Sequence, residues 1–204
     1  MKISDIRLLP LRGATPDGGW DDKFLDTENN LHTLVEVVTD AGVTGLGSVF
    51  TSAKLIEGSI DVMKPFLIGA SALDPAATTE NLHQQTFWQG RGGAITHAIS
   101  GIDIALWDIL GKVTKQPISR LLGGRHRESI KPYGSLLMDE PDKLCKALED
   151  GMSRGFRAFK IGWGPFGRVD AKTDEAIIKA ARDTLGPDNE LMVDAGGSDA
   201  FWPH

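Results

Sequence analysis

Cysteine is almost absent from this sequence. The one cysteine among 204 residues, Cys145, excludes an internal disulfide and is typical of a protein from a reducing cytoplasm. Cys145 falls on the apolar stripe of a helix expected after residue 140, so we expect it to pack in the interior and not to act as a nucleophile.

Long hydrophobic runs are also lacking. No stretch approaches the length of a membrane span, and residues 1–5 lack the apolar core of a secretion signal. We therefore expect a cytoplasmic protein that has no membrane as a partner.

Clusters of positive charge are the third absence. Lys and Arg number 22 against 28 Asp and Glu, the net charge is −6, and no run of basic residues occurs. This argues against nucleic acid as a partner, but a local cationic site for a small anionic substrate remains compatible with it. The composition, 41% hydrophobic and 25% charged, is ordinary for a globular protein, and the length leaves room for two domains.

The first 125 residues have the pattern of an α+β domain. Residues 2–12, 31–39 and 43–50 read as strands, and the turn at 40–42 predicts a hairpin, so we expect an antiparallel meander. Helices are expected at 52–63, with a break at Pro65, and at 94–113, where isoleucine and leucine recur every three or four residues. The polar residues His97, Asp103 and Asp108 in the second helix read as structural.

A polar, glycine-rich stretch at 13–22 interrupts this pattern and reads as a loop. Two large apolar side chains, Trp20 and Phe24, lie in or next to it. Either they pack onto the core, or they belong to a lid that closes over a ligand.

The pattern changes at the boundary expected between residues 125 and 126. Strands at 130–137, 156–162 and 191–194 alternate with two helices. The first helix begins at Glu140-Pro141, and the second ends at Leu185 before Gly186-Pro187. Strand–helix–strand units imply parallel strands with right-handed crossovers. A closed (β/α) barrel takes eight such units, so residues 126–204 contain its start and the barrel is incomplete in this chain.

Two charged residues stand near the ends of consecutive strands, Lys160 and Asp194. In parallel α/β folds the carboxyl ends of the strands carry the catalytic groups. An ammonium base or electrophile beside a cation-binding carboxylate is one interpretation. The other is a solvated surface lysine and a turn aspartate, which is the commoner role of each residue taken singly.

Four motifs together resemble the enolase superfamily, and more closely its mandelate racemase and muconate lactonizing branch. They are the helix segment 97–108, the run Gln116-Pro117-Ile118 with the Leu-Leu-Gly-Gly turn at 121–124, the strand end 159–162, and the strand end 192–195. They occur in the order and at the spacing of the family. The resemblance implies a capping domain, residues 1–125, followed by the first part of a TIM-like barrel, residues 126–204.

The resemblance also implies roles for individual residues. Lys160 matches the second lysine of a Lys–x–Lys pair, the general base, whereas Ala158 occupies the position of the first lysine. Asp194 matches the first of three carboxylates that hold Mg²⁺, and Gly196 stands where acid-sugar members often carry asparagine. The other metal ligands and the acid/base groups of the opposite face belong to later strands than those in this chain.

The implied reaction is abstraction of the α-proton of a carboxylate through an ene-diolate that Mg²⁺ stabilises. We expect an acid-sugar dehydratase, with a racemase or a cycloisomerase as the alternative. Substrate contacts are expected from residues in loops of the two domains: Trp20, Lys23, Thr51 and His204.

A different class of function stays open, that of a truncated, non-catalytic fragment or interaction module. Relatives of this kind are commonly homo-oligomers, so we expect a homo-oligomer or a second chain that completes the barrel.

Overall fold

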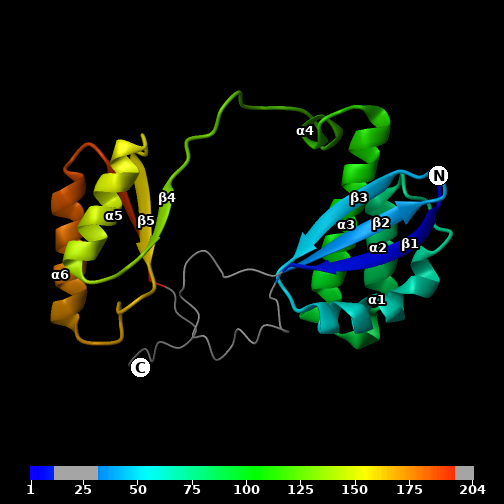
Figure 1. The fold of residues 1–204 in the computed structure, drawn as a ribbon, viewed down its shortest axis with the longest axis horizontal. Helices are drawn as coiled ribbons and strands as arrows, with labels where there is room; N and C mark the ends of the chain where they lie inside the picture. The colour runs from blue at the N-terminus through cyan, green and yellow to red at the C-terminus, as the bar shows by residue number, and fades with distance from the viewer. Residues whose placement is uncertain (12–31, 196–204) are drawn as a thin grey trace. The chain divides into compact units, whose positions relative to one another are not determined.

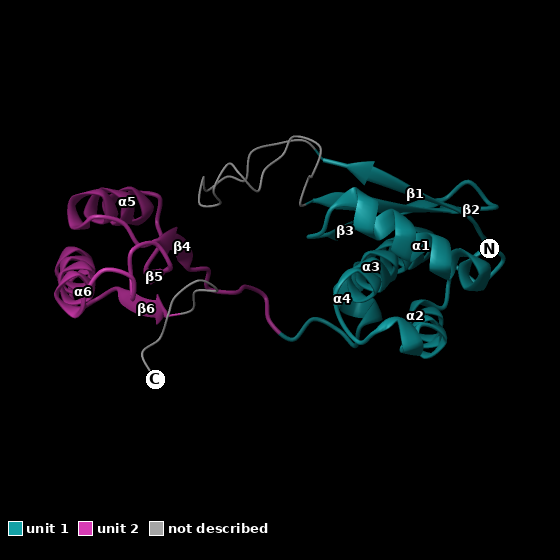
Figure 2. Ribbon diagram, turned by 90° about the horizontal axis from the view of Figure 1, so that it is seen from below, with its two compact units in different colours: residues 1–126 teal, residues 127–204 magenta. Residues whose placement is uncertain are grey.

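The computed structural model describes residues 1–11 and 32–195 of the chain. These form two compact units, residues 1–126 and residues 127–204, which Figure 2 distinguishes by colour. Each unit has its own hydrophobic core.

The first unit is built on an antiparallel sheet with the strand order β1-β2-β3, which confirms the predicted meander. The turn between β2 and β3 closes with a hydrogen bond of 3.1 Å from the Gly42 N–H to the Thr39 carbonyl. Gly42 has a φ of +76°, a conformation that glycine adopts without strain. The strands are β1 (Ile3–Pro10), β2 (Thr33–Thr39) and β3 (Thr44–Val49).

Helices cover one face of this sheet (Figures 1 and 2). The predicted end of the first helix before Pro65 is wrong, because α1 continues through this proline to Leu67. Pro65 has no N–H to donate to the Asp61 carbonyl, so α1 continues past it with one helical hydrogen bond fewer. Met63 and Leu67 on either side are buried, and the Ile68 N–H donates to the Lys64 carbonyl at 3.0 Å. The helices are α1 (Ala53–Leu67), α2 (Pro75–Gln85), the 3₁₀ helix η2 (Phe87–Gln89), α3 (Ala94–Thr114) and the short α4 (Ile118–Leu121).

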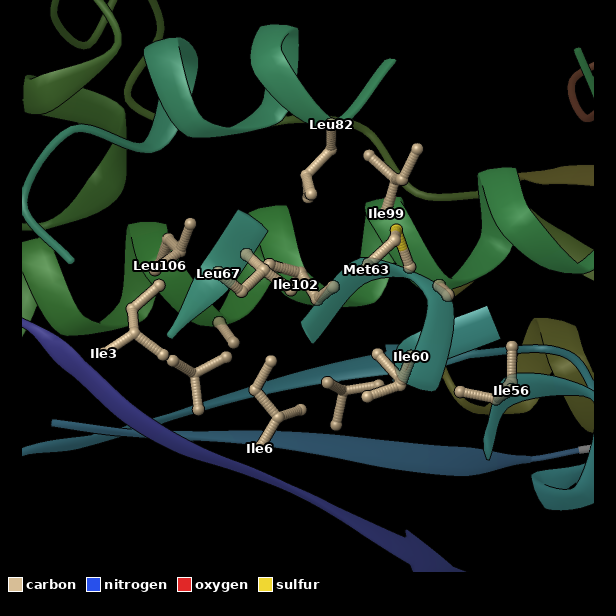
Figure 3. Packing of buried hydrophobic residues seen from close by; sticks show 14 of the residues in the cluster. Ile3, Ile6, Ile56, Ile60, Met63, Leu67, Leu82, Ile99, Ile102 and Leu106 are labelled. Atoms are coloured by element: carbon tan, nitrogen blue, oxygen red, sulfur yellow. The ribbon is translucent and has the colours of Figure 1, made fainter. Parts of the chain in front are cut away.

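The longest helix, α3, forms the centre of the first core. Its isoleucine and leucine side chains meet residues of the sheet and of α1, as Figure 3 shows. At 21 residues, α3 is long and apolar enough to cross a membrane by length and composition alone, which the sequence analysis did not predict. Burial of its apolar stripe against the sheet explains this composition. The buried α3 residues are Ala98, Ile99, Gly101, Ile102, Ala105, Leu106 and Ile109.

The polar residues of α3 have structural partners, as predicted. Asp108 accepts hydrogen bonds from the Leu46 N–H at 2.9 Å and from the Lys112 ammonium at 2.8 Å. Asp103 accepts a hydrogen bond of 2.8 Å from the Thr79 hydroxyl. These contacts attach α3 to β3 and to α2.

The second unit contains a parallel sheet with the order β4-β5-β6. The predicted strand 130–137 begins four residues too early, because β4 starts at Gly134. Pro132 has no N–H to donate to a ladder, and Ile130 is 81% exposed. The elements are β4 (Gly134–Leu137), α5 (Pro141–Ser153), β5 (Ala158–Gly162), α6 (Ala171–Leu185) and β6 (Glu190–Asp194).

Both helices of the second unit lie on the same face of its sheet (Figures 1 and 2). Cys145 of α5 is half-buried and accepts a hydrogen bond from the Thr184 hydroxyl of α6 at 3.0 Å, which fits the packing role predicted for it. Within the described residues no helix covers the opposite face of the sheet, and that face carries the candidate site. The core between helices and sheet consists of Met138, Leu144, Leu148, Phe159, Ile161, Ile177, Ala181 and Leu185.

Candidate active site

The central strand β5 separates core residues from site residues by simple alternation. Phe159 and Ile161 are fully buried in the core under α5 and α6. Because neighbouring side chains of a strand point to opposite faces, Ala158, Lys160 and Gly162 belong to the face away from these helices. Lys160 is the one charged residue of β5. It therefore lies on the face of the sheet that no described helix of this unit covers.

Asp194 on β6 reaches the same place. Its partner in the parallel register is Gly162, and Lys160 pairs with Met192. The Lys160 ammonium extends toward the carboxyl end of the sheet and donates a hydrogen bond of 2.9 Å to Asp194 Oδ2. The two side chains are 31% and 35% exposed, so solvent and small solutes can reach them. The structure thus brings together the two residues that the strand-end argument singled out.

Gly162 makes room for this pair. A Cβ atom at position 162 would lie 2.7 Å from Asp194 Cβ and 2.7 Å from the Asp194 carbonyl oxygen. Real Cβ contacts are essentially never this short, so the position of Asp194 depends on glycine at this neighbour.

The environment of Lys160 favours its charged form. The hydrogen bond to Asp194 raises the pKa of the Lys160 ammonium; partial desolvation works against it, and the charge of Asp194 adds to it. The electrostatic interaction with Tyr133 also raises this pKa, and Lys160 Nζ lies 5.8 Å from the centroid of the Tyr133 ring. Tyr133 was not predicted from the sequence, because its contact with Lys160 depends on the register of β4 against β5, in which Ser135 pairs with Lys160.

Two protein-family models match this chain. The model of the mandelate racemase/muconate lactonizing enzyme N-terminal domain matches residues 26–123, and the enolase C-terminal domain-like model matches residues 143–201. The chain belongs to the mandelate racemase/muconate lactonizing enzyme branch of the enolase superfamily. The three parallel strands are accordingly part of the barrel of this fold, which is incomplete in this chain.

Relatives from sugar-acid metabolism match most of the chain. A D-galactarolactone cycloisomerase from Agrobacterium fabrum is 36% identical over 96% of this chain and 52% of its own. A D-galactonate dehydratase from Cronobacter sakazakii is 33% identical over 80% of this chain and 44% of its own. The crystal structure of the 3,6-anhydro-D-galactonate cycloisomerase from Zobellia galactanivorans superposes with a TM-score of 0.80 at 31% identity, over 96% of this chain and 51% of that one. The chain therefore spans about half the length of the relatives that it matches.

Enolase-superfamily members generally use Mg²⁺, and Asp194 fits one part of that requirement. A carboxylate at a strand end offers the hard oxygen donor that Mg²⁺ prefers. Among residues 1–11 and 32–195, however, no cluster of three or more His, Cys, Asp or Glu side chains could hold a metal ion. These residues could therefore supply one carboxylate to such an ion but not its complete ligand set.

Ala158 occupies the position at which the resemblance predicts a first lysine. Its side chain is 2% exposed, and its register partner on β6 is Glu190, which forms an ion pair with Lys131. Position 158 therefore adds no ammonium beside Lys160.

The other residues predicted to contact the substrate stay predictions. Thr51 belongs to the first unit, and its hydroxyl is in contact with His97 Nδ1 and donates to the Phe50 carbonyl at 2.6 Å. Its role toward a substrate stays a prediction. Trp20, Lys23 and His204 lie outside the described residues, as do Phe24 and Gly196.

Proposed function

We propose that this chain forms part of the active site of an Mg²⁺-dependent acid-sugar dehydratase, in which Lys160 removes the α-proton of the substrate carboxylate. The observation that carries the proposal is the contact of 2.9 Å between Lys160 Nζ and Asp194 Oδ2 at the carboxyl ends of adjacent parallel strands. Membership of the enolase superfamily and the sugar-acid relatives support it.

The first step would be the same for all reactions of this class. The neutral amine of Lys160 takes the proton from the carbon next to the carboxylate, and the electron pair of the C–H bond moves into the carboxylate to give an ene-diolate. Asp194 would be one of the carboxylates that hold Mg²⁺. When bound, the ion supplies Lewis-acid stabilisation of this negative charge, as is general for enolase-superfamily sites.

Dehydration follows if the ene-diolate expels the hydroxyl group on the β-carbon. The resulting enol then takes up a proton and becomes a 2-keto-3-deoxy acid. The polar and aromatic residues predicted for the capping loops, Trp20, Lys23 and Thr51, with His204 from the barrel part, suit a polyhydroxylated substrate. The named activity of the dehydratase relative is D-galactonate dehydration, which gives the first substrate to test.

Cycloisomerisation is the second candidate, and two comparisons favour it. The 36% identical relative and the structure with a TM-score of 0.80 are both cycloisomerases of galactose-derived acids. Such a reaction passes through the same ene-diolate but opens a ring, so that the leaving group stays attached to the product.

The test is an NMR assay in buffered D₂O with D-galactonate and D-galactarolactone, with Mg²⁺ and with EDTA. We expect Mg²⁺-dependent formation of a keto-deoxy acid from D-galactonate, and loss of at least about 1,000-fold of the rate in Lys160→Ala, since removal of a general base costs of this order. Consumption of the lactone alone would select the cycloisomerase. Turnover that survives in Lys160→Ala would contradict the proposal.

The non-catalytic alternative is decided on the same preparation. A denaturing intact-mass spectrum shows whether a second polypeptide completes the barrel or whether the 22.0 kDa chain is alone. A single species without turnover would favour the interaction module. A cytoplasmic location and a homo-oligomer stay predictions that fractionation and light scattering can check.

A further inference from the structure

Trp163 has a backbone conformation that its residue type does not favour. It follows Gly162 directly, at the carboxyl end of the strand that carries Lys160, and its φ is +62°. Bulky L-residues rarely occupy this left-handed region, and such strain clusters at binding and catalytic sites. Glycine would adopt the same conformation without strain.

Neighbouring backbone contacts impose this turn. The Met138 N–H donates to the Gly162 carbonyl at 2.8 Å, and the Phe166 N–H donates to the Trp163 carbonyl at 3.3 Å. Gly164 has a φ of +60°, and a Cβ there would lie 2.0 Å from the Met138 carbonyl oxygen. The chain at position 163 therefore follows the end of β4 closely and has little freedom to relax.

Burial does not offset the strain. Trp163 is 40% exposed and is not a member of the hydrophobic core beneath α5 and α6. The other described non-glycine residue with positive φ, Lys115 at +53°, caps the end of α3, where a left-handed residue is usual. No helix end explains Trp163 in this way.

The position of Trp163 relates it to the candidate site. Its Cα atom is one peptide unit, about 3.8 Å, from that of Gly162, and Gly162 is the register partner of Asp194. Tryptophan offers a broad apolar surface and an N–H donor, which together match a hydroxylated carbon chain with exposed C–H groups.

We propose that Trp163 is a specificity-determining residue, whose indole packs against the carbon chain of the sugar acid beyond its reacting carbons and donates its N–H to a hydroxyl group. This inference rests on the proposed function. A contact with substrate accounts for a half-exposed tryptophan in a strained turn at this rim, where its side chain adds nothing to the described core.

The experiment compares Trp163→Gly and Trp163→Phe with the matched control Lys115→Gly. Lys115 is the other described non-glycine residue with positive φ, and it lies in the first unit. The three variants and the parent are assayed with D-galactonate and its C4 epimer, and substrate affinity is measured by calorimetry in the Lys160→Ala background. We expect Trp163→Gly to raise KM about tenfold and to reduce the preference between the epimers, with a smaller change in kcat. Lys115→Gly should leave KM and the preference unchanged, and neither glycine variant should melt at a lower temperature than the parent.

Trp163→Phe keeps a large aromatic ring, so it should retain most of the affinity but lose part of the preference between epimers. If the parent turns over the substrate and both Trp163 variants keep its KM, affinity and epimer preference, this inference is overturned and the proposed function stands. If the parent shows neither binding nor turnover of these substrates, the proposed function is overturned, and this inference with it.

Discussion

Lys160 and Asp194 share a hydrogen bond of 2.9 Å at the rim of a parallel sheet, and Gly162 lies directly beside them. The hydrogen bond to the carboxylate raises the pKa of Lys160, and the charge of Asp194 adds to this, so Lys160 rests as an ammonium. In the proposed reaction Lys160 can accept a proton only after its ammonium has lost one, so we expect activity to depend on the geometry around Asp194.

Gly162→Ala tests this geometry. The new methyl group would need the space of Asp194 Cβ, 2.7 Å away, and would push the carboxylate from its place. We expect the Mg²⁺ concentration for half-maximal activity to rise by about 10- to 100-fold, the usual range for changes that misorient a metal ligand. Gly92→Ala is the control, because a Cβ at position 92 meets nothing within 4 Å. An unchanged Mg²⁺ dependence in Gly162→Ala would show that Asp194 does not hold the ion.

Strand-end placement made Lys160 and Asp194 predictable at the residue scale, because period-two alternation and parallel pairing leave few arrangements. Tyr133 and Trp163 were not predictable in the same way. The contact of Tyr133 with Lys160 depends on the register of β4 against β5, and the positive φ of Trp163 depends on backbone contacts with Met138. Neither is encoded in a local pattern.

At the scale of single elements, α6 begins with a well-formed cap. Asp170 accepts a hydrogen bond of 2.7 Å from the Thr173 N–H, and this bond lowers the pKa of the Asp170 carboxyl below its ordinary value of 3.8. A carboxyl whose pKa is lower in the folded state stabilises the folded state at pH values above its pKa in the unfolded state. This stabilisation is lost as the pH falls through the pKa of the folded state.

Asp170→Ala should therefore lower the melting temperature by a few degrees at neutral pH and speed amide exchange in the first turn of α6. The difference from the parent should shrink in acid, as the parent's own carboxyl becomes protonated. Asp170→Asn keeps a capping oxygen and should melt near the parent at neutral pH. A difference between the parent and Asp170→Ala that does not change with pH would contradict the assignment of the cap to the ionised carboxylate.

The contact between β3 and α3 also depends on glycine. A Cβ at Gly47 would lie 1.9 Å from the Gly101 carbonyl oxygen of the helix. Gly47→Ala should lower the free energy of unfolding by about 1–3 kcal/mol, as overpacking does. Gly58→Ala, in open space on α1, should instead raise it by about 0.5–1 kcal/mol. Urea unfolding of both variants checks this, and equal effects would contradict the close approach.

Element prediction succeeded where one face is strongly apolar, as in α3 and in the three strands of the first unit. It failed for α2, which was not predicted, because Pro75, Thr78 and Leu82 are its only buried residues in the structure and give no clear stripe. It also failed at Pro65, where α1 continues past the proline because Leu67 beyond it is buried, which local preference does not report. At residues 130–133 the signal was present in the sequence, since Pro132 has no N–H to donate to a strand ladder.

For the whole molecule, the order of elements and the four motifs were enough to predict the family and the partial barrel, because the motifs span both units. The sequence did not narrow the proposed substrate to one sugar acid. The resemblance assigns substrate recognition to loops of the capping domain and to residues outside the described strands.

The central claim is that Lys160 removes the α-proton of a sugar acid in an Mg²⁺-dependent reaction. The most direct measurement is turnover of α-deuterated D-galactonate by the protein, with the released label followed by ²H NMR. We expect a several-fold slower reaction than with the protonated substrate, transfer of the label to solvent, and loss of both turnover and transfer in Lys160→Ala. Equal rates for the two substrates, with the label retained on the α-carbon, would contradict it.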